Sequence, residues 1–196
     1  MKKFIIAWLG LVCSLAFAES TPSLQNLLSS FQSFHAHFHE IAGALQAEGE
    51  LWIQKPGKFY WKASSPNAEI FLSDGEDFYR YEPGLLQAIR SPLSNTLDQT
   101  PLLLLSGEIT DLSEHYVVEI LSPEHFRLKP KDSTQSGGLI TSMDLQFQSG
   151  KLSSFSLKSQ LGQETLVTFS KVEWNPPIPS SLFHFVLPEG ADLLAG

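Results

Sequence analysis

The chain has 196 residues, 13 of them basic and 21 acidic, and a formal net charge of −8 at pH 7. A surface with this charge repels phosphate, which argues against binding to nucleic acid or to anionic lipid headgroups. The single cysteine is Cys13, so an internal disulfide is excluded and the fold must rest on packing.

The first 18 residues have the three zones of a secretory signal peptide. Lys2 and Lys3 give a positive start, residues 4–17 are apolar and uncharged, and Ala16-Phe17-Ala18 supplies a small-x-small cleavage pattern. This apolar run has 14 residues, whereas a helix that crosses a bilayer needs about 20. We therefore predict that residues 1–18 are cleaved off; a retained N-terminal anchor is the alternative.

The chain that remains after this cleavage, residues 19–196, is predicted to form a single domain. It has 178 residues, no cysteine and a formal charge of −10, because two lysines leave with the signal. Lipid attachment at Cys13 is disfavoured, since Val12 just before it is not the small residue that such a site expects. The mature protein is therefore expected to move freely in the cell envelope.

Residues 19–34 are predicted to form an amphipathic helix. Ser20 or Thr21 can cap it, and Pro22 suits the first helical position. One apolar stripe runs along it with helical spacing, formed by Leu24, Leu27, Leu28 and Phe31.

From Phe34 onwards the hydrophobic period is that of strands joined by tight turns. Strands are predicted over residues 34–39, 45–53, 58–63, 68–73, 77–81, 85–90, 115–121, 124–130, 139–148, 151–159 and 164–174. Residues 91–113, with a leucine run after Pro101, predict one or two short helices between strands. Pro176, Pro177 and Pro179 predict the end of the sheet, with Phe183-His184-Phe185 docking near the C-terminus.

The fold class predicted from this pattern is mainly β with helices (α+β). About eleven antiparallel strands share one apolar face, and the twist of so long a sheet favours an incomplete barrel. Only the two helical segments can cover that face, as a lid. Such an arrangement can hold a lipid, or it can simply be a core, and the pattern leaves both open.

No catalytic motif, metal site or cofactor site is predicted. The sequence lacks a nucleophile elbow, a Walker loop, a zinc-protease helix and a dinucleotide fingerprint. His35, His37 and His39 alternate on a strand and could meet one metal ion. However, side chains two residues apart on a strand are about 6.5–7 Å apart, which is wide for ligands with bonds of about 2.1 Å. The favoured interpretation is that these histidines face water while Phe34 and Phe38 face inward.

Six strings carry a resemblance to a known family. They are Ser33–Phe38, Gly49–Trp61, Ser73–Gly75 with Tyr79–Pro83, Thr100–Leu105, Phe126–Lys131 and Leu187–Gly190. In this order they resemble the outer-membrane lipoprotein carrier family, LolA, over essentially the whole mature chain. The resemblance implies an incomplete antiparallel barrel closed by a helical lid, which agrees with the pattern above.

The resemblance also implies a function. A protein of this kind would be a periplasmic, monomeric chaperone without enzymatic activity. It would take triacylated lipoproteins released by an inner-membrane ABC transporter, shield their acyl chains and deliver them to an outer-membrane receptor. A lipoprotein-binding sensor or regulator with the same half-barrel, and a lipid-modifying enzyme, are the alternatives; no nucleophile–base set can be named for the enzyme.

By the same resemblance, inner-facing side chains would line an acyl-chain cavity. The expected cavity residues are Phe34, Phe38, Leu51, Ile53, Phe59, Trp61, Leu72, Leu102, Met143, Leu145 and Phe147. Lys55 stands where well-known members have an arginine that ties the barrel to the lid through backbone carbonyls, so it is the expected latch. Lysine cannot reproduce the planar fork of arginine, so we expect a weaker latch here.

Overall fold

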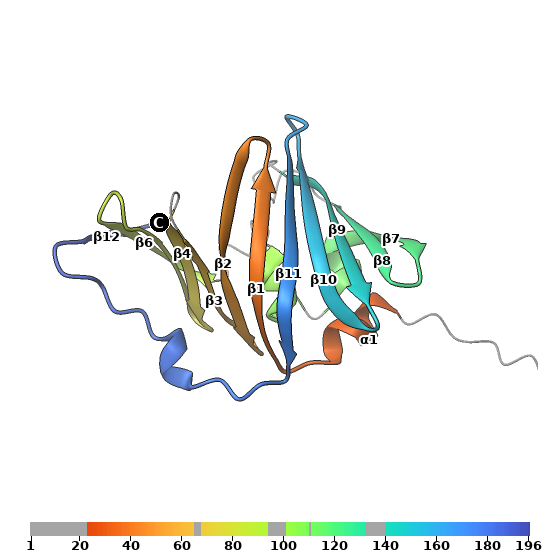
Figure 1. Cartoon of the computed structure of the whole chain (residues 1–196), viewed down its shortest axis with the longest axis horizontal. Helices are drawn as coiled ribbons and strands as arrows, with labels where there is room; N and C mark the ends of the chain where they lie inside the picture. Colours follow the sequence, from red (N-terminus) through yellow and green to blue (C-terminus); the bar gives the residue numbers. More distant parts are fainter. Residues whose placement is uncertain (1–22, 65–67, 94–100, 110, 132–139) are drawn as a thin grey trace, which may run out of the picture.

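The computed structural model describes residues 23–64, 68–93, 101–109, 111–131 and 140–196. The predicted signal peptide and its cleavage site lie outside the described residues. Within them, one sheet has the strand order β12-β6-β5-β4-β3-β2-β1-β11-β10-β9-β8-β7 (Figure 1). The bounds are β1 Ser33–Ala42, β2 Leu45–Gln54, β3 Lys58–Ala63, β4 Glu69–Asp74, β5 Asp77–Glu82, β6 Gln87–Pro92, β7 Tyr116–Ser122, β8 His125–Pro130, β9 Ile140–Gln148, β10 Lys151–Ser159, β11 Glu164–Trp174 and β12 Asp192–Ala195.

The sheet is open, with β12 and β7 at its two edges. Strands β1 to β6 and β7 to β11 form two antiparallel meanders, and the pairing of β1 with β11 joins them. This architecture agrees with the predicted incomplete barrel covered by a helical lid.

The C-terminal strand corrects the prediction that the prolines end the sheet. Among the described residues the sheet has 12 strands, because β12 adds to the edge strand β6. Its pairing is parallel, anchored by the Asp192 amide that donates to the Leu86 carbonyl (2.9 Å) and by the Gly196 amide that donates to the Arg90 carbonyl (2.8 Å). The sheet is therefore not antiparallel throughout.

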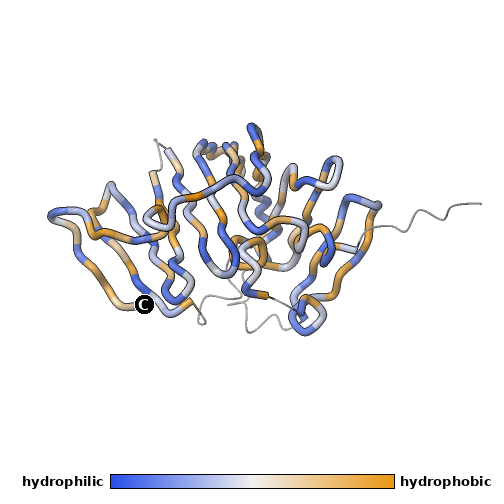
Figure 2. The backbone as a smooth tube through the Cα atoms, turned by 90° about the horizontal axis from the view of Figure 1, so that it is seen from below, coloured by the Kyte–Doolittle hydropathy of each residue, from blue (hydrophilic) through white to orange (hydrophobic). Residues whose placement is uncertain are grey.

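The two faces of the sheet have different chemistry. Figure 2 shows hydrophobic and hydrophilic positions alternating along the strands, as period-2 geometry requires. We call the face that carries Phe34, Ala36 and Phe38 the inner face; all three are buried in the hydrophobic core. His35 and His37 lie on the opposite, outer face, as the alternation predicts.

The N-terminal helix is shorter than predicted. Helix α1 is Leu24–Ser29, capped by the Ser23 hydroxyl, which accepts from the Asn26 amide at 3.2 Å. It ends where the Ser30 amide turns back to the Leu27 carbonyl, and Ser33 already begins β1. The prediction that the helix reaches residue 34 was wrong, because Phe34 pairs with Trp174 of β11 and Ile53 of β2 as part of the sheet.

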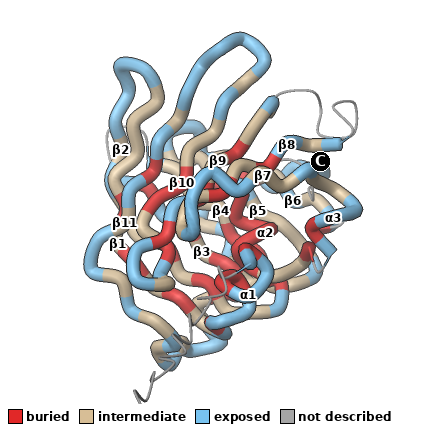
Figure 3. The backbone as a smooth tube through the Cα atoms, turned by 90° about the vertical axis from the view of Figure 1, so that its right-hand side faces the viewer, coloured by how far each residue is buried: buried red, intermediate tan, exposed pale blue. Residues whose placement is uncertain are grey.

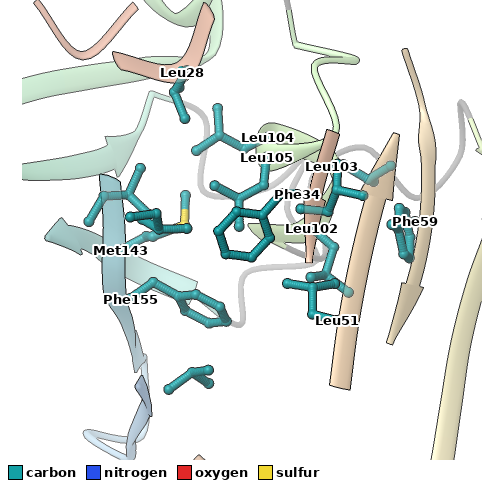
Figure 4. Packing of buried hydrophobic residues seen from close by; sticks show 14 of the residues in the cluster. Leu28, Phe34, Leu51, Phe59, Leu102, Leu103, Leu104, Leu105, Met143 and Phe155 are labelled. Carbon is teal, nitrogen blue, oxygen red and sulfur yellow. The ribbon is translucent and has the colours of Figure 1, made fainter. Parts of the chain in front are cut away.

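Two short helices cover the inner face, and we call them together the lid. They are α1 and α2, Pro101–Leu105, and Figure 3 shows the buried segments gathered around them. Each leucine of α2 is at most 3% exposed, in contact with a core that includes Phe34, Leu51 and Phe59 (Figure 4). None of the helices in the described ranges is long and apolar enough to cross a membrane.

Two further helical turns flank the sheet. Helix α3, Leu112–His115, leads into β7, and its N-cap Asp111 accepts from the Ser113 amide at 2.8 Å. The 3-10 helix η2, Ser180–Phe183, belongs to the C-terminal segment, which runs from β11 back to β12 (Figure 1). Phe185 of this segment stacks on Tyr79, with ring centroids 4.7 Å apart, and so covers part of the outer face.

Candidate ligand cavity

The inner face is filled at one end, near the start of β1. Phe34 is fully buried there, with its ring centroid 5.5 to 5.9 Å from those of Phe31, Phe169 and Trp174. Such aromatic pairs stabilise a core beyond the area that they bury. We call this region the packed end.

The other end of the inner face, near the end of β1, holds a cavity of about 310 Å³. Small side chains make this space: Ala42, Ala47 and Ala63 stand at inner-face positions where large ones stand at the packed end. The lining also includes Trp61, Leu102, Phe155, Leu157 and Val167, together with Glu40 and Glu69. We call this region the hollow end; it is apolar with two acidic side chains.

A stacked aromatic pair separates the two ends. The rings of Phe38 and Trp61 are nearly parallel, with centroids 3.6 Å apart, and Trp61 also lines the cavity. Gly49 makes this stack possible, because a Cβ atom there would lie 2.5 Å from the Phe38 ring and 2.0 Å from the Lys62 carbonyl oxygen. Any larger residue at this position would displace the stack.

The acidic side chains of the hollow end differ in their partners. The Arg80 Nε donates to Glu69 Oε1 at 2.6 Å, and the same guanidinium group lies 3.1 Å from Glu82 Oε1. Glu40 has no such donor among the described residues. Burial, and to a smaller extent the nearby Glu69 charge, raises the pKa of Glu40 above its ordinary value.

The predicted cavity residues fall into three groups. Trp61 and Leu102 line the cavity. Eight others lie in the packed core beneath the lid: Phe34, Phe38, Leu51, Ile53, Phe59, Met143, Leu145 and Phe147. Their inner-face position is as expected, but α2 occupies the space that they would enclose. The remaining residue, Leu72, was placed wrongly.

Leu72 is buried on the outer face. In the register it stands opposite Tyr60 and Tyr79, which share that face, whereas Phe71 stands opposite inner-facing Trp61. The C-terminal segment covers this part of the outer face through Phe185. Leu72 is therefore buried without belonging to the cavity wall.

The predicted latch residue contacts helix α1 and the turn that follows α2. The Lys55 ammonium donates to the Leu28 carbonyl of α1 and lies 3.6 Å from the centroid of the Phe31 ring. Its stem packs on Gly107, just after α2, where a Cβ atom would lie 3.1 Å from Lys55 Cδ. Burial lowers the pKa of Lys55 to about 8. These contacts place Lys55 between sheet and lid; that it acts as a latch stays a prediction.

Two of the three histidines of β1, His35 and His37, form part of an outer-face cluster. The ring of His35 stacks on Trp52 with centroids 4.9 Å apart, and its Nδ1 lies 3.4 Å from Glu173 Oε1. His37 Nε2 is 4.0 Å from Glu50 Oε1. Across the residues that the structure describes, no three or more His, Cys, Asp or Glu side chains group in a way that could hold a metal ion.

Sequence reasoning missed the cavity residues that are small, acidic or on the last strands. Glu40 gave a signal, because it breaks the apolar series of β1, but the strand was predicted to end before it. Ala42, Ala47 and Ala63 gave a weaker signal, because a series of small inner-facing residues indicates empty space only once the register is known.

Comparisons with known proteins agree with this architecture. The family model described as "Outer membrane lipoprotein carrier protein LolA" matches residues 29–186. An outer-membrane lipoprotein carrier protein of Chromohalobacter salexigens is 37% identical over 180 residues, covering 87% of this chain and 84% of the relative. One from Hahella chejuensis is 34% identical over an alignment of 206 positions, covering 99% and 97%.

Among solved structures, an uncharacterized conserved protein from Thermus thermophilus shares the fold. It superposes with a TM-score of 0.53 at 10% identity, covering 88% of this chain and 98% of that one. The family match spans most of the chain, and the relatives above are aligned over most of their own length. The chain therefore belongs to the outer membrane lipoprotein carrier family, LolA.

Proposed function

We propose that this protein carries lipoproteins through the periplasm, holding their acyl chains on the inner face beneath the lid. The observation that carries this proposal is an apolar inner face, covered by two short helices, in a chain of the lipoprotein carrier family. The same relatives favour a carrier over the sensor or regulator that the sequence left open.

The size of the cavity suggests how the lid takes part. About 310 Å³ is at the lower limit of ordinary ligand pockets, which span about 300–1,000 Å³. The acyl chains of a lipoprotein therefore need the space that the α2 leucines occupy. Burial of each acyl methylene contributes about 0.8 kcal/mol to binding. Displacement of the lid exposes leucines of α2 to water, and this exposure offsets part of the binding free energy. This competition keeps binding reversible, which a carrier requires.

The remaining features belong to the same proposal. Cleavage after Ala18 would leave residues 19–196 as one mature domain, unattached to either membrane. We propose that a monomer receives triacylated lipoproteins from an inner-membrane ABC transporter and passes them to an outer-membrane receptor. The protein would do this without enzymatic activity and without a cofactor.

Spheroplast release tests this function. Purified mature protein is incubated with spheroplasts that synthesise labelled lipoproteins, and the supernatant is fractionated by size. The expected result is a complex of the protein with lipoprotein in the supernatant. Trp61→Glu, which puts a charge in the cavity wall, should abolish release; Lys62→Glu, on the exposed side of the same strand, should not. Lipoproteins that stay in the membrane with the wild-type protein would disprove the proposal.

A further inference from the structure

One carboxylate on the inner face, that of Glu40, has no hydrogen-bond or ion-pair partner among the described residues. From Phe34 to Phe38 the inner-face side chains of β1 are apolar, and the next inner-face position is Glu40. It stands beside Ala47 of β2 and Val167 of β11, and all three line the cavity. In the part of the chain that the structure describes, no hydrogen bond or ion pair reaches its carboxylate.

The surroundings of Glu40 do not balance its charge. Glu69, the other acidic residue of the cavity, already accepts from Arg80 at 2.6 Å. Burial and the charge of Glu69 raise the pKa of Glu40, as expected for a carboxylate without a cation. Partial burial of a carboxylate without a cation is unfavourable, and a ligand that brings a positive charge offsets part of that penalty.

The position of Glu40 restricts which ligand group can reach it. Trp61 lies two inner-face positions closer to the packed end than Glu40 does. Acyl chains that extend toward Trp61 and Leu102 therefore leave the polar group that joins them near Glu40, and we call this group the polar junction. In an acylated lipoprotein this junction is the N-terminal cysteine. Its α-nitrogen is an ammonium group when only two ester-linked chains are present, and a neutral amide when a third chain is attached.

We propose that Glu40 is a specificity-determining residue that pairs with the α-ammonium group of diacylated lipoproteins. The protein then accepts this cargo in addition to the triacylated form, and prefers it when the chains are otherwise equal. This inference rests on the carrier function proposed above. It adds a charge-based selection to a site that otherwise recognises hydrocarbon.

Synthetic lipopeptides of one sequence, uncharged apart from the α-nitrogen, separate charge from chain number. The first carries two palmitoyl esters and a free α-amine, the second has that amine acetylated, and the third has it palmitoylated. Binding of each to the mature protein is measured by calorimetric titration at pH 7.5. The wild type should bind the free amine about 10-fold more tightly than the acetylated peptide, which corresponds to about 1.4 kcal/mol.

Glu40→Gln should remove this preference, with free-amine binding about 10-fold weaker and the two neutral peptides changed less than about 2-fold. Glu48→Gln, on the outer face of β2, is the matched control and should change none of the three affinities. Equal weakening of all three peptides by Glu40→Gln would show a structural role and overturn the inference. Equal binding of the free-amine and acetylated peptides by the wild-type protein would also overturn the inference. Absence of binding to all three peptides would instead disprove the carrier function.

Discussion

The packed end and the hollow end of the inner face are built by the same strands, yet one is filled and the other is empty. At the packed end, Phe34 of β1 stands opposite Ile53 of β2, and Phe59 of β3 follows. At the hollow end, Glu40 stands opposite Ala47. The bulky side chains Phe34, Ile53 and Phe59 therefore stand at one end, and the alanines that border the cavity stand at the other. A fold that needs a core and a cavity obtains both on one face by this difference.

The difference also explains why a lid of short helices suffices. Helix α2 begins beside the cavity with Pro101 and ends at the packed end, where the Gly57 amide donates to the Ser106 carbonyl at 3.0 Å. At the packed end, Lys55 links α1 to the sheet through the Leu28 carbonyl. These contacts tie the lid to the sheet at the packed end.

The largest expected effect comes from emptying the packed end. Phe34→Ala should lower the free energy of unfolding by about 3–5 kcal/mol, because its ring is fully buried among three aromatic neighbours. Leu157→Ala, at the border of the existing cavity, should cost at most about 2 kcal/mol. Urea denaturation measures both. Equal losses would show that the two ends are packed alike.

Most of the fold could be predicted from the sequence because apolar and polar residues alternate along most of the strands. The exceptions occur where alternation carries no information. Ile70, Phe71 and Leu72 of β4 are consecutive apolar residues, since the lid side and the C-terminal segment bury both faces of this strand. The side of Leu72 then depends on its register with β3, which no local pattern reveals.

Strand β12 was missed for a related reason. Its four residues are all exposed and show no buried face, and its partner β6 is about a hundred positions earlier in the chain. The cavity could be predicted only as an apolar surface. Whether such a surface is filled or hollow depends on where α2 lies, and the leucine run of α2 fits either state.

The same alanine-to-leucine change at both ends should sharpen the comparison. Ala36→Leu at the packed end should destabilise the protein by about 1–3 kcal/mol, because Ala36 is fully buried and no space is available. Ala63→Leu should leave stability within about 1 kcal/mol, since its side chain can enter the cavity, and should weaken lipopeptide binding about 10-fold. Denaturation and calorimetric titration separate these effects. Unchanged lipopeptide binding by Ala63→Leu would show that the cavity is not the entry point for acyl chains.

The smallest effect is expected from the titration of Lys55, which joins the packed end to the lid. Its pKa is about 8 in the folded protein against an ordinary 10.5, so the unfolded chain binds more protons between these values. Stability should therefore rise as pH increases from about 8 toward 10.5, and this gain is lost as pH falls through 8. Solvent screening of a partly exposed group limits this gain in stability to about 1 kcal/mol.

Lys55→Met, measured by urea denaturation at pH 7.5 and 9.5, should lack this gain. Lys55→Arg stays charged at both pH values and should also lack the gain in stability. If the wild-type protein shows the same pH dependence as Lys55→Arg, the Lys55 ammonium group does not titrate in this range.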